Sequence, residues 1–388
     1  MAPTILALIV IALVAVEIAF RWRHQAARRR PYHVALRFKW NRMHVVPHPY
    51  LSFAYKKNET IDLNQPLPYE LHPNRYFSFK NPLKLNRYGY FGPDWPLEKP
   101  PGTLRIACLG ASATANNIAD ADRDYSYPDM LQRMLAADFR EAGIDQEVEV
   151  LNFGIGGRTT AELVIVFFLH IVHFKPDVVL FYQGFNDLMF HLMDDFAPDY
   201  SHGRCSLGER IHAIRFAHAL PRLPWWHSYE ALKERLFGTG NTRNDLWRVL
   251  MTQKPDMNRD FEHMEVKERF LESIVAGCRH YGFRLILGTY GYYEYRFNKT
   301  TLKYRDGVMI ENDIVRAIGR KYGLTVVDLA ETIPNDADHY VDSLHLSPKG
   351  MEVLARGFAD AILTGVAGHP GSAEGDINAA RADTSMPR

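Results

Sequence analysis

The stretch Leu104-Arg-Ile-Ala-Cys-Leu-Gly-Ala-Ser-Ala-Thr114 decides the fold of this chain. Its first residues are apolar apart from Arg105, which is typical of a strand covered on both faces of a sheet. Gly110 permits a tight exit from that strand, because glycine has no Cβ, and Ser112 follows immediately. A serine in so short a motif more often forms a turn or caps a helix. The stretch therefore predicts a buried strand ending at an exposed hydroxyl, provided that the rest of the chain supplies partners for it.

Three later stretches supply candidate partners. Val148-Glu-Val-Leu-Asn-Phe-Gly-Ile-Gly-Gly-Arg-Thr159 predicts a strand that runs into glycines, whose backbone N–H groups can approach a ligand closely. Asp177-Val-Val-Leu-Phe-Tyr-Gln-Gly-Phe-Asn-Asp187 predicts another buried strand, and it ends near Asn186, whose side-chain amide can donate to an anion. Asp342-Ser-Leu-His345 places a carboxylate and an imidazole three residues apart, just before a predicted helix.

Together these stretches contain the groups that acyl transfer requires. A serine hydroxyl needs an adjacent base, the base needs a group that holds it in one tautomer, and the developing oxyanion needs hydrogen-bond donors. In an open parallel sheet such groups meet at the carboxyl ends of the strands, and three of the four stretches are predicted strand exits. The sequence therefore favours a serine hydrolase.

With these stretches in this order, the chain resembles the SGNH or GDSL hydrolases, a family named for Ser, Gly, Asn and His in four separate blocks. The resemblance extends over residues 104–363. It implies that Ser112 is the nucleophile, that His345 is its base and that Asp342 orients His345.

The same resemblance implies the composition of the oxyanion hole, which would contain the backbone amides of Ser112 and Gly157 and the side chain of Asn186. One residue departs from the family pattern. The first block usually reads Gly-Asp-Ser, and here Ala111 stands in place of the Asp. A carboxylate that helps to order this turn in relatives is therefore absent.

The elements around these blocks alternate between strand and helix. The strands are predicted at 104–109, 147–152, 177–183, 284–290 and 325–329, and the helices at 126–142, 160–173, 262–281, 308–322 and 348–363. This alternation predicts an α/β domain with a parallel sheet and helices on both faces. The resemblance implies a three-layer α/β/α, flavodoxin-like SGNH hydrolase fold with a parallel sheet of about five strands.

Composition and motifs argue against several other classes of protein. The chain has 388 residues, of which 47% are hydrophobic and 23% charged, as is ordinary for a globular protein. Its three cysteines are scattered and form neither a disulfide nor a zinc pattern. The glycines of 154–157 lack the full dinucleotide-binding spacing, and the acids and histidines of 336–345 are more typical of turns than of a metal site. We expect no cofactor, no metal and no nucleic-acid partner; protein partners are not predicted.

Residues 1–20 are nearly all apolar and about as long as a bilayer span, so they predict a transmembrane anchor. A cleaved signal peptide and a buried core helix are the alternatives. The flank 21–57 has no Asp or Glu and contains ten basic residues, namely Arg21, Arg23, Arg28, Arg29, Arg30, Arg37, Lys39, Arg42, Lys56 and Lys57. Basic residues beside a span tend to stay cytoplasmic, which predicts a single-pass membrane protein whose catalytic domain faces the cytoplasm. A solvated flank is the simpler explanation of the same charges.

The predicted domain organisation follows from these segments. It consists of a transmembrane anchor at 1–20, a basic flank and irregular membrane-proximal segment at 21–100, an SGNH hydrolase domain at 101–365 and a disordered tail at 366–388. The domain contains two predicted insertions, at about 188–261 and 291–306. Their aromatic residues, including Trp225, Trp226, Trp247 and those of 291–297, suit an acyl pocket or a sugar-stacking surface. Ordinary packing explains them equally well.

The sequence as a whole predicts a membrane-anchored serine esterase that hydrolyses O-acyl esters on a glycan or a lipid through an acyl-enzyme. An acyltransferase that passes the acyl group to a sugar hydroxyl is a first alternative, because it would use the same acyl-enzyme and differ only in the acceptor admitted. A catalytically silent binding or scaffold protein is a second alternative, and Ala111 is its only support.

Overall fold

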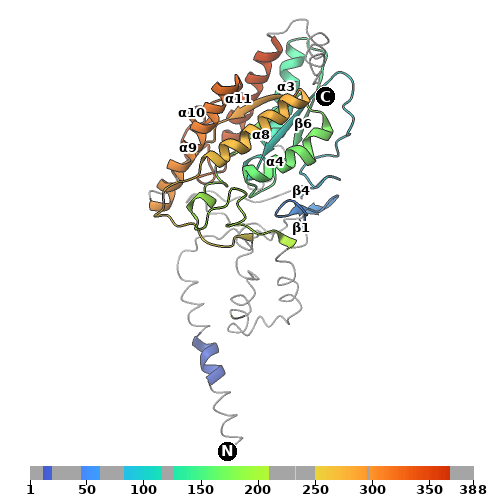
Figure 1. Cartoon of the computed structure of the whole chain (residues 1–388). Helices are drawn as coiled ribbons and strands as arrows, with labels where there is room; N and C mark the ends of the chain where they lie inside the picture. Colours follow the sequence, from blue (N-terminus) through green and yellow to red (C-terminus); the bar gives the residue numbers. More distant parts are fainter. Residues whose placement is uncertain are drawn as a thin grey trace, which may run out of the picture. The chain divides into compact units, whose positions relative to one another are not determined.

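A computed structural model of the protein describes residues 12–19, 45–61, 83–115, 126–208, 232, 250–294 and 298–367. Its main feature is a five-stranded sheet in which every neighbouring pair is parallel (Figure 1). The strands, in spatial order, are β6 (Glu147–Asn152), β5 (Thr103–Gly110), β7 (Val178–Tyr182), β8 (Arg284–Gly288) and β9 (Thr325–Val327). In chain order this is 2-1-3-4-5, the flavodoxin-like arrangement. The predicted parallel sheet of about five strands is thus confirmed.

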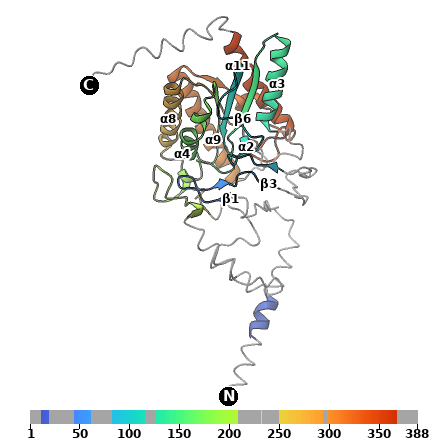
Figure 2. The same ribbon diagram turned by 90° about the vertical axis from the view of Figure 1, so that its right-hand side faces the viewer.

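Helices cover both faces of this sheet. Figure 2 shows α3 and α11 on one side and α4 and α8 on the other, and α9 packs beside α8. The helices are α3 (Tyr127–Glu141), α4 (Thr160–Leu169), α8 (Glu265–Tyr281), α9 (Lys299–Tyr322) and α11 (Pro348–Ala367). Shorter elements are β1 (Val45–Val46), β2 (Ala54–Tyr55), β3 (Thr60–Ile61), β4 (Leu83–Lys84), α2 (Ser112–Ala115), η2 (Ile171–Phe174), η3 (Phe190–Leu192) and α10 (Leu329–Thr332).

The apolar run of β5 explains why both faces of the sheet are covered. Leu104, Ile106 and Cys108 belong to one buried cluster with side chains of α3 and α11. Ala107 and Leu109 point to the opposite face, because side chains alternate along a strand, and they are fully buried as well. The strand expected at 104–109 is therefore confirmed, and it carries Ser112 at its carboxyl end.

Local sequence signals fix most helix ends. Thr159 and Glu162 form a capping box at the start of α4, in which each side chain accepts a hydrogen bond from the other's backbone N–H. Gly282 ends α8 and Gly323 ends α9, both in the left-handed conformation that glycine adopts without strain. Asn298 caps α9 by accepting a hydrogen bond from the N–H of Thr301.

Three elements have other bounds than the sequence predicts. The helix predicted at 308–322 begins at Lys299, so the described residues 299–306 of the predicted second insertion are helical. The helix predicted at 160–173 is also shorter than expected, because α4 ends at Leu169 and is followed by the 3-10 turn η2. The strand predicted at 325–329 ends at Val327, where α10 follows shortly after.

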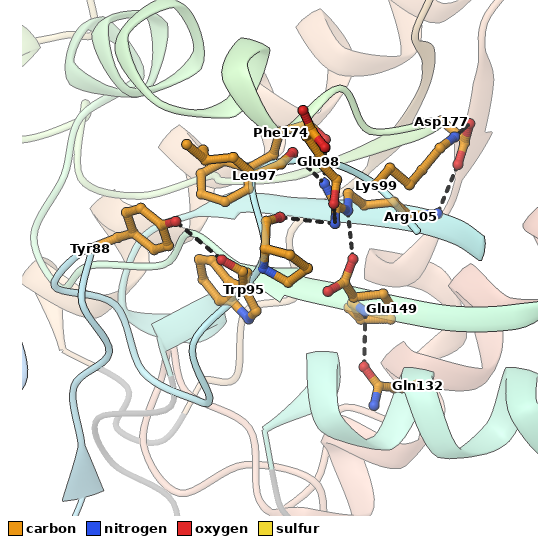
Figure 3. A network of polar contacts seen from close by, with 12 residues as sticks. Tyr88, Trp95, Leu97, Glu98, Lys99, Arg105, Gln132, Glu149, Phe174 and Asp177 are labelled. Atoms are coloured by element: carbon orange, nitrogen blue, oxygen red, sulfur yellow. Dashed lines mark hydrogen bonds and ion pairs between the residues drawn. The ribbon is translucent and has the colours of Figure 1, made fainter. Parts of the chain in front are cut away.

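A polar network holds the amino end of the sheet, and Arg105 is at its centre (Figure 3). The Arg105 side chain is fully buried, and it bonds the Glu149 carboxylate of the neighbouring strand at 2.5 Å. Its guanidinium also donates to the carbonyls of Pro96 and Leu97 at 3.0 Å and of Phe174 at 2.7 Å. The segment that leads into β5 is thereby fastened to the sheet, at the end opposite Ser112.

The chain divides into two compact units. One comprises Met1–Lys56, Leu67–Tyr76 and Arg204–Thr252, and it contains the antiparallel pair β1 and β2. The other comprises Lys57–Pro66, Phe77–Gly203 and Gln253–Arg388, and it contains the sheet and every predicted site residue. Residues 83–100, expected before the hydrolase domain, belong to this second unit: Tyr90 and Trp95 pack against Phe153, which follows β6.

Several predicted features lie wholly or partly outside the described residues. Residues 12–19 form a helix with mostly exposed side chains, but the rest of the expected anchor at 1–20 and the flank as far as 44 are not described. In the described part of the chain, no helix has the length and apolar character needed to cross a membrane. Trp225, Trp226 and Trp247 and the tail from 368 onward are also outside the described residues.

Candidate active site

Ser112 is the first residue of α2, immediately after the exit of β5. The exit is tight, because a Cβ on Gly110 would lie 2.1 Å from the Thr114 hydroxyl oxygen and 2.5 Å from the Tyr182 carbonyl oxygen. Only glycine fits there. Ala111 is buried, and its carbonyl accepts the N–H groups of Thr114 at 3.2 Å and Ala115 at 2.9 Å. The turn is therefore closed by backbone hydrogen bonds, although Ala111 supplies no carboxylate to it.

His345 lies beside Ser112, although the two residues are far apart in the chain. The distance from His345 Nε2 to Ser112 Oγ is 2.8 Å. On the other side of the ring, His345 Nδ1 lies 2.8 Å from Asp342 Oδ2 and 2.9 Å from Oδ1. An ionised carboxylate can only accept, so Nδ1 donates to Asp342 and Nε2 accepts from the Ser112 hydroxyl. The structure thus brings the three predicted catalytic residues into one hydrogen-bonded chain.

The Asp342 carboxylate is held ionised by its surroundings. Burial by itself would raise the pKa of this carboxyl. The positive charge that His345 carries when it is protonated, together with the hydrogen bonds from its ring and from two backbone N–H groups, outweighs burial and holds the pKa below its ordinary value. Oδ1 also accepts the backbone N–H groups of Leu344 at 2.7 Å and His345 at 2.8 Å. Asp342 therefore shapes the turn that carries His345 as well as orienting its ring.

Apart from Ser112, the predicted oxyanion-hole residues are Gly157 and Asn186, which lie on two segments joined by a hydrogen bond. Gly157 follows β6 and has a φ of 78°, a backbone conformation that favours glycine. Asn186 follows β7, and its side-chain amide donates to the Arg158 carbonyl at 2.8 Å. Because the amide has a second N–H, this bond orients Asn186 while leaving one donor for a ligand. The same Arg158 carbonyl also accepts from the Gln183 side chain at 3.0 Å.

Glycine also brings the Gly157 segment close to the nucleophile. A Cβ on Gly154 would lie 2.3 Å from the backbone nitrogen of Ala115 and 2.6 Å from the carbonyl carbon of Thr114. Both atoms belong to α2, the short helix that begins at Ser112. The backbone after β6 therefore packs directly on the turn that presents the nucleophile.

Two buried residues that support this site were not singled out from the sequence. Asp187 is fully buried and accepts hydrogen bonds from the backbone N–H and hydroxyl of Thr160, both at 2.9 Å. Gln183 is also buried and bonds the Arg158 carbonyl. Both lie in the quoted stretch 177–187, where polar residues interrupt an apolar strand exit. Polar residues at the end of a buried strand were therefore the sequence signal that could have identified Gln183 and Asp187.

The residues considered for a metal site have other partners. His339 Nδ1 lies 2.8 Å from Asp336 Oδ1, and Lys349 lies 3.3 Å from Asp338. Asp342 and His345 bond each other. Within the residues that the structure describes, no group of three or more His, Cys, Asp and Glu is arranged to hold a metal ion.

The family of this chain follows from a match to a sequence profile. The sequence profile of the GDSL-like Lipase/Acylhydrolase family matches residues 108–353, more than half of the 388 residues. No curated protein sequence matches the chain significantly.

Similar solved structures include a lipase/acylhydrolase from Enterococcus faecalis, with 18% identity, a TM-score of 0.41, and coverage of 66% of this chain and 94% of that one. An acetyl xylan esterase has 14% identity and a TM-score of 0.39, with coverage of 66% and 99%. An acetyl-xylooligosaccharide esterase variant from Geobacillus stearmophilus has 18% identity and a TM-score of 0.38, with coverage of 66% and 91%. On the profile match, the chain belongs to the GDSL-like lipase/acylhydrolase family and is an ester-hydrolysing enzyme.

Proposed function

We propose that the enzyme hydrolyses carboxylic O-acyl esters through an acyl-enzyme on Ser112. The observation that carries this proposal is the unbroken hydrogen-bonded chain from Ser112 through His345 to Asp342. Such a chain makes a serine hydroxyl nucleophilic at neutral pH, because the base is already within reach of the proton that it removes.

In the first half of the reaction, His345 Nε2 takes the proton of Ser112 as Oγ attacks the ester carbonyl carbon. The carbonyl π electrons move to oxygen, and a tetrahedral oxyanion forms. The intermediate collapses with loss of the alkoxide, which receives the proton from His345 Nε2. The products of this half are a free alcohol and the Ser112 acyl ester, and Asp342 stabilises the transient imidazolium without becoming protonated.

In the second half, water takes the place of the alcohol. His345 Nε2 removes a proton from water as the oxygen attacks the acyl carbon, and a second tetrahedral oxyanion forms. Its collapse breaks the bond to Ser112 Oγ, which regains the proton held on Nε2. Backbone amides of Ser112 and Gly157 and the free N–H of Asn186 are the proposed donors to both oxyanions.

The substrates that we propose are O-acyl groups on a glycan or the acyl esters of a lipid. Support comes from partly buried apolar residues beside the site. Phe185 directly precedes Asn186, and its ring lies 4.8 Å from that of Tyr304 on α9. Leu344 directly precedes His345 and is also partly buried. Apolar and aromatic surface of this kind suits an acyl chain or the apolar face of a sugar ring.

We further propose that the enzyme is anchored in the membrane by residues 1–20, with its catalytic domain on the cytoplasmic side. Support comes from the apolar character of that segment and from the ten basic residues of 21–57, which follow it without an acidic residue. Each basic residue near an anionic headgroup surface contributes about 1 kcal/mol of attraction.

The proposed catalytic residues are tested by labelling the purified enzyme with a fluorophosphonate and assaying it on short acyl esters. Ser112→Ala should abolish labelling and turnover. Asn186→Ala should keep labelling but lower kcat by roughly 10²–10³ with little change in KM, because it removes one oxyanion donor. Ser273→Ala, which changes an exposed serine on α8, is the matched control and should behave as the wild type.

Two outcomes would contradict the proposal. Undiminished turnover in Ser112→Ala would refute the nucleophile, and a folded wild type without labelling or turnover would favour a binding or scaffold role. Assays with added sugar acceptors address the remaining alternative. Acyl transfer to a sugar faster than to water would replace the hydrolase with an acyltransferase that uses the same acyl-enzyme.

A further inference from the structure

Tyr290 lies between the segment that leads from β7 to Asn186 and the turn that carries His345. It follows β8, and only 4% of its surface is exposed. Its ring stacks on Tyr182, the last residue of β7, with a centroid distance of 4.8 Å. A Cβ on Gly184 would lie 2.2 Å from Tyr290 Cβ, so the chain leading to Asn186 passes directly over this side chain.

The hydroxyl of Tyr290 reaches the other segment. It donates to the carbonyl oxygen of Leu344 at 3.0 Å, and Leu344 is the residue before His345. Neighbours of Tyr290 contact the same segment: the Tyr293 N–H donates to the Ser343 carbonyl at 3.0 Å. Tyr290 is therefore in contact with both the Asn186 side and the His345 side of the site.

Tyr290 itself is held in place by Asn312 of α9. The Tyr290 N–H donates to Asn312 Oδ1 at 2.7 Å, and Asn312 Nδ2 donates to the Tyr290 carbonyl at 2.9 Å. Asn312 is buried, so these two hydrogen bonds are protected from competition with water. Asn312 on α9 thus holds the backbone of Tyr290, and the turn that carries His345 holds its hydroxyl.

We infer that Tyr290 is a positioning residue, which fixes His345 Nε2 relative to Ser112 by holding the Leu344 carbonyl against the segment that carries Asn186. The inference rests on the proposed function. Proton transfer from Ser112 requires His345 to stay within hydrogen-bond reach, and a displacement of about 1 Å costs on the order of 100-fold in rate. No contact of Tyr290 with substrate is needed for this role.

Burial also keeps the tyrosine in the state that this role requires. It raises the pKa of the Tyr290 hydroxyl well above its ordinary value, with the charge of nearby Asp342 adding to the effect. The hydroxyl therefore remains protonated around neutral pH and donates to the Leu344 carbonyl there.

Tyr290→Phe tests the inference, because it removes only the hydroxyl and keeps the ring stack on Tyr182. We expect kcat to fall about tenfold, KM to stay within about twofold, and the rate of fluorophosphonate labelling to fall by the same factor as kcat. In an enzyme that already carries Asp342→Asn, Tyr290→Phe should lower kcat by a smaller factor than it does in the wild type, because both residues act through His345. A residue that only supports the fold would lower the melting temperature and leave kcat of the folded enzyme unchanged.

Tyr90→Phe is the matched control. Tyr90 is also a buried tyrosine, and its hydroxyl bonds His170 Nδ1 at 2.5 Å at the end of α4, instead of the turn that carries His345. Its loss should leave kcat and labelling unchanged. Asn312→Asp provides a second test should Tyr290→Phe not fold: the carboxylate can accept from the Tyr290 N–H but cannot donate to its carbonyl, and kcat should again fall without a rise in KM.

The outcomes separate this inference from the proposed function. A wild-type enzyme that is labelled and active, with kcat undiminished in folded Tyr290→Phe or Asn312→Asp, would overturn the positioning role alone. A rise in KM with unchanged kcat would overturn it too, since that pattern indicates a binding contact. A wild type that is neither labelled nor active would overturn the function and the inference together.

Discussion

Asp342 shows how one side chain determines both the shape and the ionisation of the site. Its carboxylate accepts from the His345 ring and from two backbone N–H groups of its own turn. These bonds are stronger to the ionised carboxylate than to the neutral acid, which holds the pKa of Asp342 below its ordinary value in the folded state. The sequence was enough to pair Asp342 with His345, because the two residues are three positions apart and their hydrogen bonds form within one turn.

This pKa predicts how stability depends on pH. A carboxyl whose folded pKa is depressed adds stability above its unfolded pKa of about 3.9, and that stability is lost as pH falls through the folded pKa. Asp342→Asn should therefore be less stable than the wild type at about pH 6, and the difference should shrink as pH falls toward 3. Urea unfolding at several pH values measures it, with exposed Asp145→Asn as the control. A difference that stays constant with pH would contradict the assigned pKa direction.

At the scale of elements, the two ends of the sheet have different roles. The carboxyl ends carry Ser112, Gly157 and Asn186, whereas the amino ends are joined by Arg105 and its partners (Figure 3). The fully buried guanidinium pairs with Glu149 and donates to several carbonyls, so its contacts with the described residues join parts of the fold to one another. A substitution at the amino ends of the strands should therefore lower the stability of the enzyme without lowering kcat.

Arg105→Met tests this separation. The change leaves Glu149 and several carbonyls without their shared donor. Removing one partner of a fully buried ion pair costs about 3–5 kcal/mol of unfolding free energy, and the partial exposure of Glu149 places the expected loss at the lower end of that range. The kcat of the folded variant should stay within about twofold of the wild type. Arg284→Met is the matched control. Arg284 also lies near the amino end of a strand, but among the described residues its side chain donates to the carbonyls of Ala361 and Ile362 and to no carboxylate, so about 1–2 kcal/mol is expected. Chemical denaturation and ester assays measure both effects, and equal losses in the two variants would contradict the special role of Arg105.

At the scale of the whole molecule, every proposed catalytic residue lies within one compact unit, from Ser112 to His345. Residues 1–56 belong to the other unit. The family profile likewise begins at residue 108, well after the apolar N-terminal segment. Catalysis and membrane attachment are therefore expected to reside in different parts of the chain.

Removal of residues 1–20 should release a folded and active enzyme into the soluble fraction, because the sheet begins only at Thr103. The full-length chain is the control and should stay with the membranes. Fractionation followed by ester assays measures both, and external protease should leave the full-length domain intact in whole cells. An insoluble or inactive truncated chain would make the first residues part of the catalytic fold, and digestion in whole cells would reverse the proposed sidedness.

The sequence by itself determined the sheet and the identity of the candidate catalytic residues. Apolar runs and glycine exits are local signals, and the rule that parallel strands share their carboxyl ends brought Ser112, Gly157 and Asn186 to one edge. The resemblance carried by the four blocks then joined His345 to Ser112, 233 residues apart. The roles of these residues stay predictions until the variants are measured.

Only the tertiary structure decided which residues support the site. Tyr290 in the sequence is one aromatic among several, and only folding places its hydroxyl on the Leu344 carbonyl. Arg105 interrupts an apolar strand, and only the packed sheet shows the acceptors that surround it. Local patterns report whether a residue is buried, but a buried hydrogen bond depends on a partner that the chain brings back from far away, and no periodicity encodes that partner.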